Sequence, residues 1–95
     1  MRKNEARLGD LLSTLAQDPR YKPKLYQKKI ENTWQEMMGV WVSQETRSIR
    51  IRDGRLTIRI ASSALREELA FMKETIREKV NSALGEEFIT EVVVK

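Results

Sequence analysis

Apolar residues recur along the chain with two different periods, and these periods divide it into predicted helices and strands. Leucines spaced three and four residues apart predict an amphipathic helix over about residues 5–17. The proline at position 19 is expected to end this helix, because the residue before a proline avoids the α region. A second apolar stripe, which includes Trp34, predicts a helix over about residues 23–38 that stops at Gly39.

Residues over about 46–60 alternate between apolar and polar on both sides of Asp53-Gly54. This pattern is a strong signal for a β-hairpin, because Asp-Gly readily takes the positive φ angles of a type I′ turn. One face of the hairpin is expected to pack on the helices through Ile49, Ile51, Leu56, Ile58 and Ile60. The other face is expected to carry Arg50, Arg52, Arg55 and Arg59.

The last third of the chain predicts a long helix and a closing strand. A serine pair offers an N-cap to a helix over about residues 63–84, and Gly85 is expected to end it. A β-branched run over about residues 88–94 then predicts a strand. The order indicates a single α+β domain over residues 1–95, with two N-terminal helices, a hairpin, a long helix and a strand that completes a three-stranded sheet packed on the helices.

The absence of histidine and cysteine from the 95 residues bears on the class of protein. The chain lacks the usual general base near neutral pH, the usual nucleophilic thiol and the usual zinc ligands. We therefore expect a non-enzyme without cofactor or metal. No apolar run is as long as about 18 residues, and there is no signal-peptide core. Both observations favour a cytoplasmic protein without membrane association.

The formal net charge of +4 is unevenly distributed. Residues 1–30 hold eight Lys and Arg against three Asp and Glu, giving +5, whereas residues 61–95 hold five against seven, giving −2. Such asymmetry suggests a polyanionic partner for one side of the molecule. The hairpin arginines are the leading candidates, because the guanidinium fork matches phosphate. Their alternative role is to keep a sheet face soluble and to discourage edge pairing.

A second candidate is the basic segment over residues 20–29, which contains five cations and two tyrosines. The cations could hold a nucleic-acid backbone while a tyrosine stacks on a base. The alternative is an ordinary helix with a lysine-rich solvent face and Tyr26 in the core. The lysines predicted to bind nucleic acid are Lys22, Lys24, Lys28 and Lys29. Trp34 is expected in the core, and Trp41 is assigned to neither the core nor the surface.

Several motifs also carry a family resemblance. In chain order they are Leu8-Gly9-Asp10-Leu11-Leu12, Trp34 with Gly39, Thr46, Asp53-Gly54-x-Leu56, Ile58-x-Ile60-Ala61-Ser62-Ser63, Leu65-x-x-x-Leu69-x-Phe71, and Gly85 before an apolar strand. In this order and spacing they resemble the DciA family, long classed as a domain of unknown function. The resemblance implies a K-homology-like fold and a role in loading or operating the bacterial replicative helicase on DNA.

The chain departs from nucleic-acid-binding K-homology domains in one respect. Its glycines, at positions 9, 39, 54 and 85, cannot form the Gly-x-x-Gly loop that clamps a nucleic-acid backbone. Binding would then rest on arginine and lysine, which favours low sequence specificity. The predicted function is a DNA-binding accessory protein that holds single-stranded or junction DNA and assists the helicase. Two alternatives stay open: a protein–protein adaptor that docks near Trp41 or at a strand edge, and a non-specific RNA-binding protein.

Overall fold

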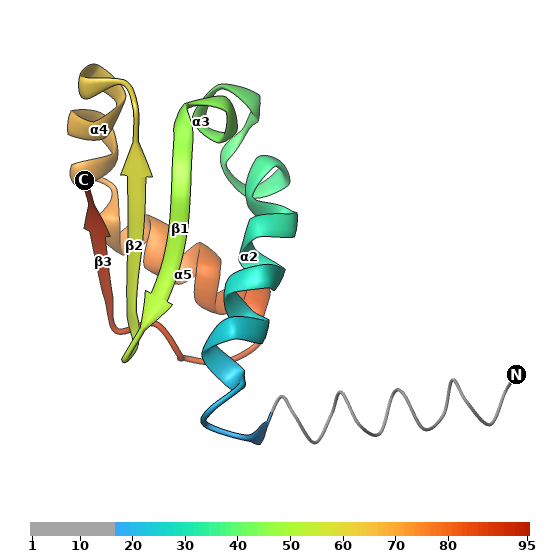
Figure 1. The fold of residues 1–95 in the computed structure, drawn as a ribbon. Coiled ribbons are helices and arrows are strands. Elements are labelled where there is room, and N and C mark those ends of the chain that lie inside the picture. The colour runs from blue at the N-terminus through green and yellow to red at the C-terminus, as the bar shows by residue number, and fades with distance from the viewer. Residues whose placement is uncertain (1–16) are drawn as a thin grey trace, which may run out of the picture.

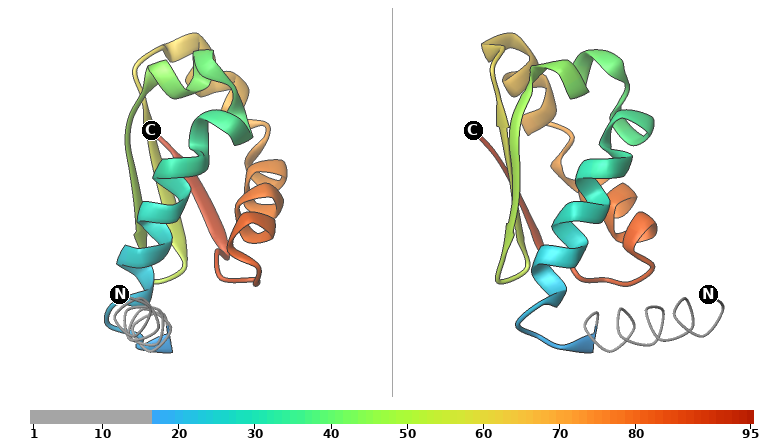
Figure 2. Two further views of the ribbon diagram at one scale, coloured as in Figure 1. Left: turned by 90° about the vertical axis from the view of Figure 1, so that its right-hand side faces the viewer. Right: turned by 45° about the vertical axis from the view of Figure 1, so that its right-hand side comes forward.

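In the part of the chain that the structure describes, the helices lie on one side of the sheet (Figure 1). A computed structural model describes residues 17–95, with the strands in the order β1-β2-β3. The strands are β1 (Thr46–Arg52), β2 (Arg55–Ile60), which is antiparallel to β1, and β3 (Glu91–Val94), which is parallel to β2. The helices are α2 (Lys22–Met38), α3 (Val40–Glu45), α4 (Ser63–Ala70) and α5 (Lys73–Leu84). In Figures 1 and 2, α5 crosses behind the sheet and α2 runs beside β1, so no helix within residues 17–95 covers the sheet face toward the viewer of Figure 1.

This arrangement confirms the predicted α+β fold and agrees with the K-homology-like architecture that the family resemblance implies. The predicted helix over residues 23–38 and the predicted hairpin over residues 46–60 are both present. The predicted first helix, over about residues 5–17, lies almost entirely in residues 1–16, outside the described residues.

The hairpin turns at Asp53-Gly54. The φ angles of these residues are 51° and 77°, the combination of positive values that a type I′ turn requires. Gly54 also contacts the segment before β3, because its carbonyl oxygen accepts a hydrogen bond from Thr90 N at 2.8 Å. A Cβ at position 54 would lie 3.0 Å from Thr90 Oγ1. The positive φ angle therefore favours glycine here, and any Cβ would also force the Thr90 side chain to shift.

The core lies between the sheet and the helices, as the alternation predicts. The hairpin contributes five buried residues: Ile49, Ile51, Leu56, Ile58 and Ile60. The helices contribute Ile30, Trp34, Val42, Leu65, Leu69, Ile76, Val80 and Leu84. Trp34 is a core residue as expected, with an exposed fraction of 2%, and its indole Nε1 donates to Thr46 Oγ1 at 2.9 Å. This bond joins α2 to the start of β1.

The predicted long helix is present as two segments, α4 and α5, separated by a turn at Phe71 and Met72. One straight helix over residues 63–84 would be about 33 Å long, whereas β2 extends only about 20 Å. The turn keeps both segments against the sheet, so that Leu69 and Ile76 are buried. In one continuous helix, Met72 would follow Leu69 by three residues and share its buried face. Met72 is instead 39% exposed.

The closing strand is shorter than predicted, because it begins at Glu91 rather than near residue 88. The partner strand explains the difference. β2 begins at Arg55, which pairs with Glu91, so residues 88–90 have no strand beside them. Ile89 is nevertheless buried, with an exposed fraction of 1%.

A buried asparagine on α5 holds this irregular segment. Asn81 is 2% exposed, and its Nδ2 donates to the Ile89 carbonyl oxygen at 2.9 Å and to Glu87 Oε2 at 3.2 Å. Its Oδ1 accepts from Ile89 N at 2.8 Å and from Phe88 N at 3.2 Å. The Asn81 side chain therefore supplies hydrogen-bond partners to backbone groups of Phe88 and Ile89, which do not pair with β2.

We expect Asn81→Ala to lower the free energy of unfolding by roughly 2–4 kcal/mol, because both polar backbone groups of the buried Ile89 lose their partner. Chemical denaturation followed by circular dichroism measures this loss. The control is Ser82→Ala, on the exposed side of the same helix, which should change stability by less than about 0.5 kcal/mol. An equally small loss for Asn81→Ala would contradict this role of Asn81.

Candidate nucleic-acid interface

The uncovered face of the sheet carries the arginines predicted from the hairpin alternation. Its polar positions are Ser48, Arg50, Arg52, Arg55, Thr57 and Arg59, and all four arginines are exposed. In the register of the two strands, Arg52 lies opposite Arg55, and Arg50 lies opposite Thr57. We call this surface the open face. It presents guanidinium groups along the whole length of the hairpin.

Carboxylates offset only part of this charge. Arg55 Nε donates to Glu91 Oε2 at 3.0 Å, so β3 supplies a partner to the central strand. Arg52 Nε lies 3.9 Å from Asp53 Oδ2, and both side chains are 94% exposed, which makes this pair weak. Within residues 17–95, Arg50 and Arg59 form no ion pair. The open face therefore keeps a positive charge.

The three strands contain no phenylalanine, tyrosine or tryptophan. Aromatic rings are the usual platforms for stacking on bases, whereas phosphate contacts need only cations and hydrogen-bond donors. The chemistry of the open face therefore fits the sugar–phosphate backbone of a nucleic acid, with little discrimination between sequences.

Helix α2 lies along the free edge of β1, and this contact places the candidate lysines. Gln27 Oε1 accepts from Ile51 N at 3.1 Å, so Gln27 marks the side of α2 that meets the strand edge. At 3.6 residues per turn, Lys24 and Lys28 follow about 60° and 100° beyond Gln27, away from the buried Ile30. This rotation leads from the core toward the open face. Lys29, about 200° beyond Gln27, lies on the opposite side of the helix.

Lys22, the fourth candidate, is engaged within the fold. Its Nζ lies 2.7 Å from Glu86 Oε1 and 5.4 Å from the ring centre of Phe88. Tyr26 donates its hydroxyl hydrogen to the same carboxylate and packs edge-on against Phe88. Lys22, followed by Tyr26, holds the pKa of the Glu86 carboxyl below its usual range. These contacts join the start of α2 to the segment before β3.

Trp41 is a surface residue. It is 57% exposed on α3, beside Val40 at 53%. Two large apolar side chains thus stand in water on α3, the helix that Figure 1 shows at the end of the molecule where β1 begins.

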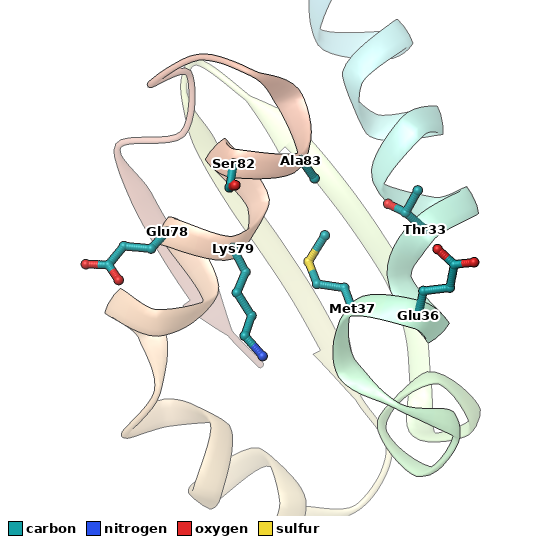
Figure 3. Close-up of a pocket in the computed structure, with 7 residues that line it drawn as sticks. All are labelled: Thr33, Glu36, Met37, Glu78, Lys79, Ser82 and Ala83. Carbon is teal, nitrogen blue, oxygen red and sulfur yellow. The ribbon is translucent and has the colours of Figure 1, made fainter.

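A hollow between α2 and α5 lies on the helical side, away from the open face (Figure 3). It measures about 710 Å³ and is lined by Thr33, Glu36, Met37, Glu78, Lys79, Ser82 and Ala83. Met37 from α2 extends toward α5 in its centre, and acidic side chains lie around it. None of the predicted nucleic-acid residues lines it. Among residues 17–95 there is no group of three or more acidic residues placed to hold a metal ion.

A second basic feature adjoins the open face. A hollow of about 350 Å³ is lined by Arg47, Arg59, Ile60, Ala61, Arg66 and Lys95, and we call it the basic hollow. The alternation pattern identified Arg59 alone of these cations. Arg66 belongs to α4 and Lys95 follows β3, so only the tertiary fold brings them to the hairpin.

The fold and this surface define a small α+β domain with one uncovered, basic sheet face. The chain matches the family described as "Dna[CI] antecedent, DciA" over residues 7–94, and it therefore belongs to the DciA family, a family of helicase loaders. The resemblance drawn from the motifs is confirmed. The family is a loader and accessory family rather than a catalytic one. No curated protein and no solved structure matches the chain. No helix within residues 17–95 is long and apolar enough to span a membrane.

We expect the contact between Lys22 and Glu86 to stabilise the fold above acidic pH only. The pKa of Glu86 in the folded chain lies below its ordinary value of 4.5. The stabilisation is therefore present above that value and is lost as the pH falls through the folded pKa. Glu86→Gln should lower the melting temperature at neutral pH, and the difference from the parent should shrink at about pH 3.

Thermal unfolding at both pH values measures this effect. The matched control is Glu36→Gln, because Glu36 is exposed and forms no ion pair within residues 17–95. A difference between Glu86→Gln and the parent that is the same at both pH values would show that the charge of Glu86 is not what matters.

Proposed function

We propose that the open face binds the sugar–phosphate backbone of single-stranded or junction DNA while the domain assists loading or operation of the replicative helicase. The supporting observation is the uncovered sheet face, on which Arg50, Arg52 and Arg59 stand exposed. The helices α2 to α5, which bury the core among the described residues, lie on the other side (Figure 2). A flat surface with cations along its length is open to an extended strand.

The proposed mechanism is electrostatic. Each phosphate that an arginine neutralises releases condensed counterions, so the affinity falls as salt rises, with a slope of about 0.7 per contact on a single strand. Lys24 and Lys28 extend the same basic surface around the edge of β1. Because such contacts carry no sequence information, the domain would hold DNA wherever the strand is accessible. This property suits a loader, which must act on many sequences.

The second candidate function is a protein–protein adaptor, and the exposed Val40 and Trp41 favour it. Large apolar residues that stand together on a surface mark contact sites. The two functions are compatible, because this patch lies on α3 and the arginines lie on the sheet. In the combined proposal, Trp41 contacts the helicase while the open face holds the strand.

The open face predicts a specific salt dependence. Arg50→Gln with Arg52→Gln should weaken binding of unrelated single-stranded oligonucleotides to a similar extent. The slope of log affinity against log salt should also flatten by about 0.7 for each lost contact. Folding stability should stay the same or rise slightly, because the change removes repulsion between neighbouring cations. Fluorescence anisotropy across a salt series measures the slope, with single-stranded DNA, duplex DNA and RNA compared in parallel.

The matched control is Lys73→Gln with Lys79→Gln, which removes the same charge from the exposed side of α5, behind the sheet. Only the arginine variant should change the slope. A companion variant, Lys24→Gln with Lys28→Gln, tests whether α2 shares the surface. If the arginine variant keeps the parent's affinity and slope, the open face is not the binding site.

A change at Trp41 should weaken helicase binding and leave DNA binding unchanged, which is the reverse of what we expect for the arginine variant. Trp41→Ser should weaken binding to the purified replicative helicase by about tenfold or more, the size expected for an aromatic anchor. DNA affinity and its salt slope should not change. Biolayer interferometry with immobilised helicase measures the first quantity. Phe71→Ser is the control, because Phe71 is even more exposed, at 87%, and lies between α4 and α5. Equal helicase binding by parent and Trp41→Ser would remove Trp41 from the interface.

A further inference from the structure

Cations from four parts of the chain meet at the end of the sheet where β2 and β3 finish. This is the upper end in Figure 1, beside the mark for the C-terminus and the start of α4. Arg47 comes from β1, Arg59 from β2, Arg66 from α4, and Lys95 from the residue after β3. The basic hollow therefore exists only in the folded chain.

Arg47 is turned outward by an irregularity in β1. The register with β2 shifts between Thr46 and Ser48, so Arg47 is an extra residue in the strand. Strict alternation would put Arg47 on the same side as the buried Ile49. A bulge of this kind redirects a side chain, and Arg47 is exposed. The hairpin thus delivers an additional guanidinium to the hollow.

Two of the other groups are fixed by hydrogen bonds. Arg66 Nη1 donates to the Ile60 carbonyl oxygen at 2.8 Å. The main chain of Lys95 is held in the sheet, because Lys95 N donates to the Ile58 carbonyl oxygen and Ile60 N donates to the Lys95 carbonyl oxygen, each at 2.9 Å. A guanidinium has five N–H donors, so Arg66 is positioned by one bond and keeps most of its donors for a ligand.

The four cations of the basic hollow have no acidic partner among the described residues, unlike Lys22 and Arg77 on the helical side. Lys22 is paired with Glu86, and Arg77 contacts both Glu74 and Glu87. In contrast, no acidic residue lines the basic hollow. Within residues 17–95, none of its four cations takes part in an ion pair. Like charges gathered with no acidic side chain among them repel one another, and a bound anion would offset that cost.

We propose that the basic hollow is a phosphate site, and that it holds one phosphate group of the nucleic acid bound on the open face. Arginine donors match the oxygens of a phosphate group in pairs. Arg59 belongs to both surfaces, so a strand on the open face leads directly into the hollow. The proposal rests on the function proposed above and adds a fixed point to it: the strand is held at this end of the sheet, and the other arginines follow its backbone.

The first test uses pyrophosphate as a probe, with the whole chain at low salt. We expect saturable changes in the NMR signals of the Ala61 amide and the Arg66 side chain, and none at Asp53, at the far end of the hairpin. Arg47→Gln with Lys95→Gln should weaken pyrophosphate binding by about tenfold or more. These two side chains are exposed, so the variant should fold. Lys73→Gln with Lys79→Gln removes equal charge and should bind as the parent does.

The second test compares oligothymidylates with and without a 5′-phosphate. A terminal phosphate carries a charge of about −1.5 to −2, so preference for the phosphorylated strand, lost in Arg47→Gln with Lys95→Gln, would mean that the hollow holds a strand end. Equal affinities that fall together in that variant would mean that it holds a backbone phosphate. Both results support the phosphate site.

The proposal is overturned if pyrophosphate gives no saturable change at Ala61 and Arg66, or if Arg47→Gln with Lys95→Gln binds it as the parent does. The two proposals can fail separately. Pyrophosphate binding without oligonucleotide binding would remove the proposed function and leave the site. Oligonucleotide binding that depends on Arg50 and Arg52 but not on Arg47 and Lys95 would keep the function and remove the site.

Discussion

Leu56 and Ile58 on the central strand have no exposed surface, and they form the middle of a core that lies on one side of the sheet. Burying a side chain of this size contributes about 1.5–3 kcal/mol, and a shift of one residue in the register would turn both toward water. This burial on one side fixes the rest of the structure. The chain must return from β2 on the helical side, so none of the helices from α2 to α5 covers the face that carries the arginines (Figure 1).

The same constraint explains how the chain uses its charges. On the helical side, charges close the fold in pairs, as between Lys22 and Glu86 and between Arg77 and Glu87. The buried Asn81 serves the same purpose without charge, since it satisfies the backbone of Ile89. On the open face, only Arg55 has a close partner, in Glu91. The net charge of +4 is therefore less informative than its distribution.

A bare sheet face without aromatic rings suits a helicase loader in a particular way. Stacking and base-edge contacts would slow or restrict the movement of the strand, whereas phosphate contacts exchange readily and do not depend on sequence. The proposed phosphate site near Arg47 and Arg66 would fix one phosphate group of the strand at this end of the sheet, while the other contacts stay exchangeable. The exposed Trp41 lies on a different element, so contact with a protein partner need not compete with the strand.

The sequence by itself determined the helix that ends at Gly39, the hairpin and the two faces of the hairpin. Alternation around Asp53-Gly54 is a local signal, because side chains in a strand point to opposite sides whatever packs on them, and Arg50 and Arg52 were found in this way. The turn at Phe71 could not be predicted, since no glycine or proline marks it and only the length of the sheet requires it. The basic hollow was also hidden, because Arg66 and Lys95 reach Arg47 through tertiary contacts and a bulge. Local patterns fix which residues lie on a surface, and packing decides which of them meet.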